Sequence, residues 1–376
     1  MPLDFRGSSA SDVFREFIED TKESENYVRV IIDYSIESAV IGGLICKALR
    51  EFEIGFELIN DLLEIPLDAT RQFLINTKVG KGGSALALMS SSINTVRKTS
   101  LGYVIESPIL EEKLLDMISE YVIVPREAKY MLASSILARH TPRILRGELS
   151  QSEEEFINKL EDENLVKKVK GPMIIGWGYL QPEIAVRYSV DLLIPRYFMR
   201  DVSGELSSDV IAKELGVSRE NVMGTNYVIK QDWCIKDLYY LAYTMMCIVD
   251  EEGIEGLVAA VLNPSTMVWH ALKMYEYLGK LRVAIDEYLA GNWENKGKFK
   301  IMRIKDPPPL SMLTRALQGI GKIRHDEVVA NEAGGKVSVP LQVLTRKDRE
   351  ELRTKAVIEK GYAVLPSADA LSKVST

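Results

Sequence analysis

Short apolar runs alternate with amphipathic runs along the first half of the chain. The runs VRVIID, GFELIN, SALALMS and GYVIES predict strands at 28–33, 55–60, 84–90 and 102–107. The amphipathic runs lie at 36–52, 68–74 and 108–120. This alternation is typical of a parallel sheet covered by helices. We therefore expect an α/β fold whose parallel sheet lies in a domain spanning 1–205.

Helical periodicity dominates the middle of the chain. It predicts helices at 126–139, 150–167 and 182–192, the second of which begins with a capping box formed by Ser150 and Glu153. A strand at 173–177 returns to the first domain, which carries a helical insertion at about 110–170. Helical patterns at 207–215 and 232–291 predict a helical connector over 206–295. Strand-like runs around a Gly334-Gly335 turn predict a small α+β domain over 296–376.

Composition narrows the class of protein. The 376 residues are 46% hydrophobic, enough to build more than one core. A net charge of −7 argues against a protein that binds nucleic acid over most of its surface, so any contact with a nucleic-acid strand must be local. The three cysteines, Cys46, Cys234 and Cys247, lie in apolar segments. We therefore expect reduced thiols and a cytoplasmic protein. No signal peptide and no long apolar run is present, so we expect no membrane contact.

The first strand ends in the turn DYSIES and enters an apolar helix. Asp33 and Glu37 could hold one divalent ion, or Asp33 could simply cap the helix. Ser35 and Ser38 occupy positions where a metal cage would need charge or a tight glycine turn. A two-metal phosphodiesterase site needs about six or seven converging acidic and imidazole ligands, and the chain has three well separated histidines. We therefore predict no cofactor and no metal.

This turn resembles the first motif of the DHH phosphoesterases, D-x-D-x-D-G. On that alignment Ser35 and Glu37 replace the second and third aspartates. The second motif corresponds to LALMSSSIN, with Ser90 in the place of a carboxylate. The Asp-His-His motif corresponds to GYVIESP, and its positions hold Glu106, Ser107 and Pro108. The fourth motif, an apolar strand leading to an aspartate, corresponds to MIIGWGYL and has no acid.

The remainder of the chain is similar to archaeal RecJ-like and cell-division-cycle-45-like proteins of this superfamily. GGKVSVPLQVL resembles the K-x-S-x-R strand of the DHH-associated domain, with Lys336 and Ser338 retained and Pro340 in place of the arginine. The resemblance implies a catalytically inactive relative, a nucleoid-associated scaffold of the replicative helicase that binds the GINS complex and the MCM ring and contacts single-stranded DNA. The basic residues proposed for that contact are Lys78, Lys81, Arg97 and Lys98, together with Lys336 and Ser338.

Two other functions remain open from the sequence. One is a residual metal-dependent 5′ exonuclease or phosphoesterase that holds a single ion with Asp33, Glu37 and Glu106, if these acids lie at adjacent strand ends. The other is a free-standing single-strand binder, in which Trp177, Tyr179 and Trp233 either stack on bases or fill a core.

Two helices are unusually rich in tyrosine, tryptophan and methionine. Either these residues form the helical core, or they anchor a protein interface, because both uses favour the same residue types. The first set is Tyr239, Tyr240, Tyr243, Met245 and Met246, and the second is Met267, Trp269, Met274, Tyr275 and Tyr277.

Overall fold

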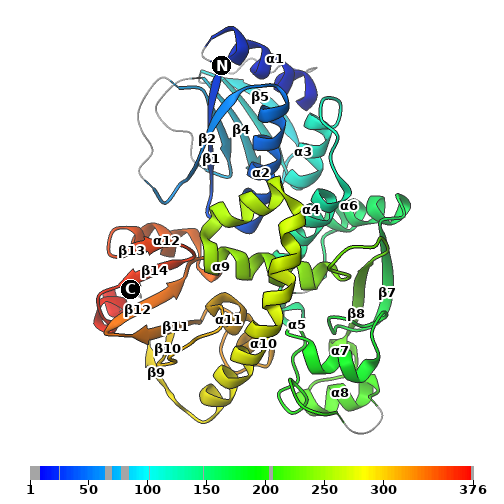
Figure 1. Cartoon of the computed structure of the whole chain (residues 1–376), viewed down its shortest axis with the longest axis vertical. Helices are drawn as coiled ribbons and strands as arrows, with labels where there is room; N and C mark the ends of the chain where they lie inside the picture. Colours follow the sequence, from blue (N-terminus) through cyan, green and yellow to red (C-terminus); the bar gives the residue numbers. More distant parts are fainter. Residues whose placement is uncertain are drawn as a thin grey trace. The chain divides into compact units, whose positions relative to one another are not determined.

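The computed structural model describes residues 9–373, except 25, 64–69, 78–83, 101, 147 and 203–205. Its contacts divide the chain into two compact units (Figure 1). The first comprises Met1–Ala133, Ser150–Phe156 and Ile254–Pro264, and the second comprises Ser134–Leu149, Ile157–Gly253 and Ser265–Thr376. This division does not test the three predicted domains, whose boundaries at 205 and 295 stay predictions.

The first unit is built on a six-stranded sheet. Its strands are β1 (Tyr27–Ile32), β2 (Gly55–Asn60), β3 (Gln72–Ile75), β4 (Ala85–Ser90), β5 (Thr95–Thr99) and β6 (Gly102–Ser107). Their spatial order is β2-β1-β3-β4-β6-β5, and every neighbouring pair is parallel except β5 with β6. The predicted α/β fold with a parallel sheet is confirmed.

The continuous apolar runs arise because the central strands are buried on both faces. β3 is buried along its whole length, and β1 along all but its first residue. Parallel strands covered on both sides lose the apolar-polar alternation of a half-exposed sheet. Helices α1 (Ala10–Glu23), α2 (Ile36–Glu51) and α3 (Leu110–Ile118) pack on the sheet, and α1 also packs against α3.

The predicted amphipathic segment at 68–74 is wrong in part, because Gln72–Ile75 is strand β3. Four residues are too few to show a period, and the segment lies in the middle of the sheet, where both of its faces are covered. Helix α4 (Arg126–Arg139) matches its predicted bounds.

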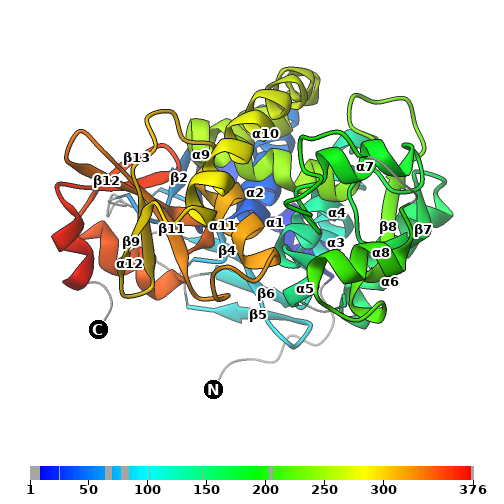
Figure 2. The same ribbon diagram turned by 90° about the horizontal axis from the view of Figure 1, so that it is seen from below.

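The second unit contains the part of a long kinked helix that ends at Gly253, and a second mixed sheet. Helix α9 (Leu238–Leu262) has a non-helical residue at Gly253, with φ 80° and ψ 178°, which is a backbone conformation that glycine tolerates. Helix α10 (Met267–Leu289) follows, and α11 (Leu310–Gly319) packs against it (Figure 2). Thus helices fill most of the predicted connector.

The second sheet has the order β13-β14-β12-β11-β10-β9. Only the β10–β11 pair is parallel. Its strands are β9 (Trp293–Lys296), β10 (Phe299–Met302), β11 (Val328–Ala333), β12 (Lys336–Pro340), β13 (Val357–Glu359) and β14 (Tyr362–Leu365), and α12 (Arg346–Arg353) lies between β12 and β13 in the chain. The glycine turn joins β11 to β12 as predicted, since both Gly334 and Gly335 have positive φ.

Two predictions around residue 170 are wrong. The charged helix α6 (Gln151–Asp162) ends before Lys167, and β7 (Val166–Pro172) pairs antiparallel with β8 (Met223–Ile229). The predicted strand at 173–177 is an irregular turn, because Gly176 and Gly178 both have φ of 95°. Helix α7 (Pro182–Tyr188) and helix α8 (Ser208–Leu215) complete this region, and α7 is shorter than predicted.

A buried ionic cluster holds α5 (Arg143–Arg146) in the second unit. The Arg143 side chain is only 3% exposed and lies 3.5 Å from a carboxylate oxygen of Asp191. One guanidinium nitrogen donates to Asn226 Oδ1 at 2.8 Å. Burial raises the pKa of Asp191 and of Asp237, and the Arg143 charge opposes that rise in both. The arginine therefore compensates two carboxylates that water does not reach.

Candidate functional site

The carboxyl ends of the parallel strands carry hydroxyl and amide groups more than acids. Asn76 follows β3 and accepts the Ser90 backbone N–H on its Oδ1 atom at 2.8 Å. The Ser107 hydroxyl at the end of β6 donates to Ile109 O and accepts from Ile109 N–H. Pro108 next to it is exposed. These groups hold one another in place through neutral hydrogen bonds.

The turn between β1 and α2 is a helix cap. The Ser35 side chain accepts from the Ser38 backbone N–H at 3.2 Å and donates to the Ser38 hydroxyl at 3.0 Å. Glu37, in the first helical turn, is 9% exposed, and the Ser90 hydroxyl donates to its Oε1 atom at 3.3 Å. Serine, not Asp33, therefore caps the helix. The hydroxyl that contacts Glu37 belongs to Ser90 at the end of β4, the position where the second motif would place a carboxylate.

Glu106 does not lie beside Asp33. Between β1 and β6 lie β3 and β4, so three strand spacings of about 4.8 Å place the two strand ends roughly 14 Å apart. The Glu106 carboxylate instead accepts from Thr95 at 3.1 Å and from Arg97 at 3.2 Å, both on β5. The expectation that the three acids lie at adjacent strand ends is wrong.

Asp61 is an acid at this edge that the sequence reasoning missed. It follows β2, which neighbours β1, and its Oδ2 atom accepts from the Thr77 hydroxyl at 3.3 Å. The signal was an acid directly after an apolar strand, GFELIND, which is the pattern that pointed to Asp33. Even so, the described residues include no group of three or more His, Cys, Asp or Glu side chains arranged to hold a metal ion. Their donor set does not fit the two-metal cluster of a phosphodiesterase.

The segment matched to the fourth DHH motif lies elsewhere. MIIGWGYL belongs to the second unit, and its glycines form the turn after β7 instead of a strand of the parallel sheet. Ile174 and Trp177 pack on an apolar cluster with α7 and α8. Trp177 is thereby used as a packing residue, whereas Tyr179 is 37% exposed.

The proposed basic contacts are dispersed and partly paired. Lys78 and Lys81 lie outside the described residues. Arg97 pairs with Glu106, and the Lys98 ammonium donates to the Tyr103 hydroxyl at 3.1 Å and lies 3.9 Å from Glu16. Both cations are half exposed. Whether they contact nucleic acid stays a prediction.

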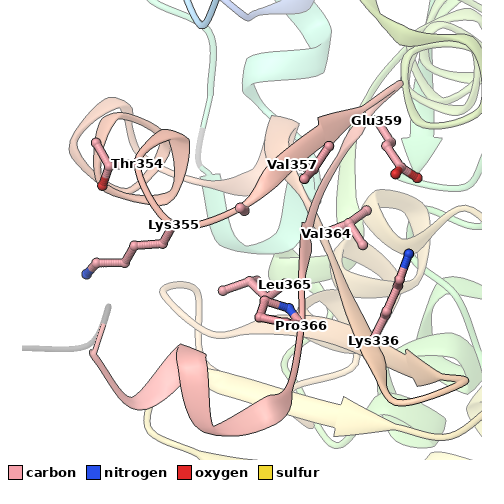
Figure 3. A pocket seen from close by; sticks show the side chains of 9 residues that line it. Lys336, Thr354, Lys355, Val357, Glu359, Val364, Leu365 and Pro366 are labelled. Carbon is pink, nitrogen blue, oxygen red and sulfur yellow. The ribbon is translucent and has the colours of Figure 1, made fainter.

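Lys336 and Ser338 lie on β12, two residues apart on one face of the strand. Lys336 is exposed at the edge of a 420 Å³ pocket whose apolar lining includes Val357 and Leu365. In Figure 3, Lys336 and Glu359 lie on the same side of this pocket, whereas Lys355 extends from the other side. Ser338 is half-buried and is paired in the sheet with Asn331 and Val364.

The two aromatic helices separate into core and surface. Tyr239, Tyr243, Met245 and Met246 of α9 are buried, and so are Met267, Met274 and Tyr277 of α10. By contrast, Trp269 and Tyr275 of α10 are 70% and 60% exposed. Tyr240 and Tyr275 line a second pocket of 330 Å³. Thus the first set is mostly core, whereas the second divides between core and an outward face.

The first unit is an α/β domain with a mostly parallel sheet, and its described residues form no group of three or more acidic, histidine or cysteine side chains that could hold a metal ion. A search of solved structures finds the fold of CDC45: the crystal structure of CDC45 from Entamoeba histolytica aligns with a TM-score of 0.60 over 97% of this chain and 98% of that chain, at 9% sequence identity. The resemblance read from the sequence is therefore confirmed at the level of the fold.

Two RecJ structures also align with the chain. RecJ from Thermus thermophilus in complex with Mn²⁺ gives a TM-score of 0.43 at 12% identity, over 100% of this chain and 55% of that chain. An exonuclease RecJ bound to manganese gives 0.43 at 12% identity, over 96% and 92%. No protein family matches the sequence, and a search of curated proteins finds no relative. Within the described residues, no helix is both long and apolar enough to span a membrane.

Proposed function

We propose that the protein is a non-catalytic component of the replicative helicase, a scaffold that binds the GINS complex and the MCM ring and contacts single-stranded DNA. The fold shared with CDC45 over nearly the whole of both chains supports this proposal. The observation that carries its non-catalytic part is the strand-end edge of the first unit, where Ser90 donates to Glu37 and Glu106 turns toward Arg97.

The chemistry of phosphodiester hydrolysis explains why that edge matters. Two-metal enzymes place the ions about 3.5–4 Å apart, with ligands that converge on both. In this protein the acids at the ends of β1 and β6 are separated by three strand spacings. The intervening strand ends carry Asn76 and Ser90, whose neutral oxygens bind hard cations less strongly than carboxylates do. We therefore expect the protein not to hydrolyse DNA.

A nuclease assay tests the non-catalytic part. Purified protein is incubated with end-labelled single-stranded DNA and with a dinucleotide, in Mn²⁺ and in Mg²⁺. We expect no cleavage above that of an Asp33→Ala variant, and calorimetry with Mn²⁺ should give the same heat for both proteins. Metal-dependent cleavage that disappears in Asp33→Ala would show a residual single-metal exonuclease and refute the proposal.

Co-purification tests the assembly role. The tagged chain is co-expressed with the GINS subunits of the same organism and purified at moderate salt. A stoichiometric complex on size exclusion supports the scaffold function. If the chain elutes alone, whether or not MCM is added, the proposed role in the helicase is refuted. If it elutes alone but binds single-stranded DNA with a strong salt dependence, it is a free-standing strand binder.

A further inference from the structure

The outer face of α10 is apolar where a surface helix usually carries polar residues. Val268, Trp269, Leu272 and Tyr275 are 44%, 70%, 61% and 60% exposed. The inner face of the same helix is packed in the core, since Met267, Met274 and Leu281 are buried. Contiguous exposed apolar residues of this kind mark interaction sites more often than isolated ones do.

A groove of 330 Å³ runs along this face within the second unit. One wall is α10, and the opposite wall comes from the turn at 175–180, from α7 and from the residues before α9. Its floor is formed by buried aliphatic side chains, and its rim by half-exposed tyrosines. The floor residues are Ile175, Ile235 and Leu278, and the tyrosines are Tyr179, Tyr188, Tyr240 and Tyr275.

The groove walls are fixed in place. Asp237, which is fully buried, accepts the backbone N–H of Gly176 at 3.2 Å and those of Tyr239 and Tyr240 at 2.8 and 3.1 Å. One carboxylate thus joins the turn that carries Tyr179 to the start of α9. The rings of Tyr188 and Tyr275 meet edge to face at 5.4 Å across the walls. A groove held in this way needs little ordering when a ligand binds.

The length of the groove along α10 suits a helical ligand. The α10 residues that line it are spaced three or four apart, from Val268 through Leu272 and Tyr275 to Leu278. Ten residues of helix rise about 15 Å, which is close to three turns of a second helix lying alongside. Ligand helices insert apolar residues at i, i+3 or i+4, and i+7 into grooves of this length.

The charge of the groove specifies the polar part of the ligand. Lys236 is the only charged residue that lines it among those described. Its ammonium donates to Gln231 O and pairs at 3.2 Å with Asp232, whose side chain is fully exposed. Exposed pairs of this kind contribute little free energy, so a carboxylate on a ligand can replace Asp232 at small cost.

We propose that this groove, defined by α10 and Lys236, binds an amphipathic helix of a partner protein that carries an apolar stripe and an acidic residue facing Lys236. This proposal goes beyond the replication role and does not depend on it. The groove selects its ligand by apolar periodicity and one charge, as helix-in-groove interfaces do. Tyrosine, which forms the rim of the groove, is among the residue types that dominate binding energy in such interfaces.

The test is a selection from random peptides of about 16 residues, which span about 24 Å as helices. The peptides are displayed on phage, selected on the intact protein and counter-selected on a Leu272→Glu variant. We expect the enriched sequences to share apolar residues at helical spacing and at least one acid, and to gain helical circular dichroism on binding.

Matched variants make the result specific. By fluorescence polarisation, Leu272→Glu should weaken the selected peptides about tenfold or more, since it puts a charge into the groove. Val283→Glu should leave their affinity unchanged, because Val283 is 57% exposed on α10 but does not line the groove. Lys236→Glu should weaken acidic peptides, and changing their acid to lysine should restore binding to that variant.

Three outcomes would overturn the proposal. Enriched peptides could lack a helical period, which would indicate an extended ligand. They could bind Leu272→Glu as tightly as the unaltered protein. Finally, sedimentation could show a dimer that Leu272→Glu dissociates, in which case a second copy of the chain fills the groove.

Discussion

Replacing Asp250 by asparagine should remove a large part of the pH dependence of the unfolding free energy. Asp250 lies in α9 and is fully buried. Its carboxylate accepts the Ser311 N–H and the Ser311 hydroxyl, each at 2.7 Å, and the Gln342 amide at 2.9 Å. Burial raises the pKa of this group from 3.8 to about 7, and the hydrogen bonds to Ser311 and Gln342 oppose the rise.

The sign follows from which state holds the proton. Between pH 3.8 and about 7, Asp250 is ionised in the unfolded chain and protonated in the folded one. The folded state binds more protons in that window, so its stability falls as the pH rises. The contribution of Asp250 is complete below pH 3.8 and is lost above about pH 7. At 1.36 kcal/mol per pH unit, the loss amounts to about 4 kcal/mol, of which about 3 kcal/mol falls between about pH 5 and pH 8.

Urea unfolding, followed by circular dichroism at about pH 5 and about pH 8, measures this loss. The unfolding free energy of the unaltered protein minus that of Asp250→Asn should be about 3 kcal/mol larger at the lower pH. Any constant effect of the amide on packing cancels in this comparison. Ser367→Ala is the control, since Ser367 is exposed and carries no titratable group, so this variant should give the same difference at both pH values. A difference for Asp250→Asn that changes by less than about 1 kcal/mol would refute the reasoning.

Two further predictions concern stability at neutral pH. Arg143→Met should lower the unfolding free energy by about 3–5 kcal/mol, because it leaves Asp191 and a second buried carboxylate without a counter-charge. In the same urea titration Arg324→Met, at a side chain that is 68% exposed, should change it by less than about 1 kcal/mol. Gly361→Ala should destabilise strongly, since its Cβ atom would lie 2.3 Å from a backbone carbonyl oxygen. By contrast, Gly279→Ala should raise the thermal unfolding midpoint and add about 1 kcal/mol, because no atom lies within 4 Å of its Cβ position inside α10. Equal effects of the two glycine changes would contradict this account.

The sequence predicted the parallel sheet because its central strands are buried on both faces. Strands β1 and β4 appear as apolar runs for that reason. The lysine-rich strand β7 was missed, since three lysines following an acidic helix continue the helical charge pattern. The run at 173–177 was wrongly predicted as a strand because apolar content does not reveal that two glycines turn the backbone.

The candidate site was predictable only in part. The serines at the strand ends could be found in the sequence, but the distance between Glu106 and Asp33 depends on strand order, which the sequence does not state. In the same way, periodicity could not separate Met274 from Tyr275. Helix α10, which carries both residues, has apolar residues on several sides. Only the packing shows that Met274 lies in the core and Tyr275 on the surface.

The hydrogen bond between Ser90 and Glu37 also limits how the strand-end edge can change. An aspartate at position 90 would place a second negative charge close to the Glu37 carboxylate, which is 9% exposed. Like charges at close range repel unless one group is protonated or a cation arrives with them. A single substitution toward an acidic cluster would therefore lower the stability of the fold before it gained any affinity for metal. An acidic metal site at this edge would therefore need several substitutions at once.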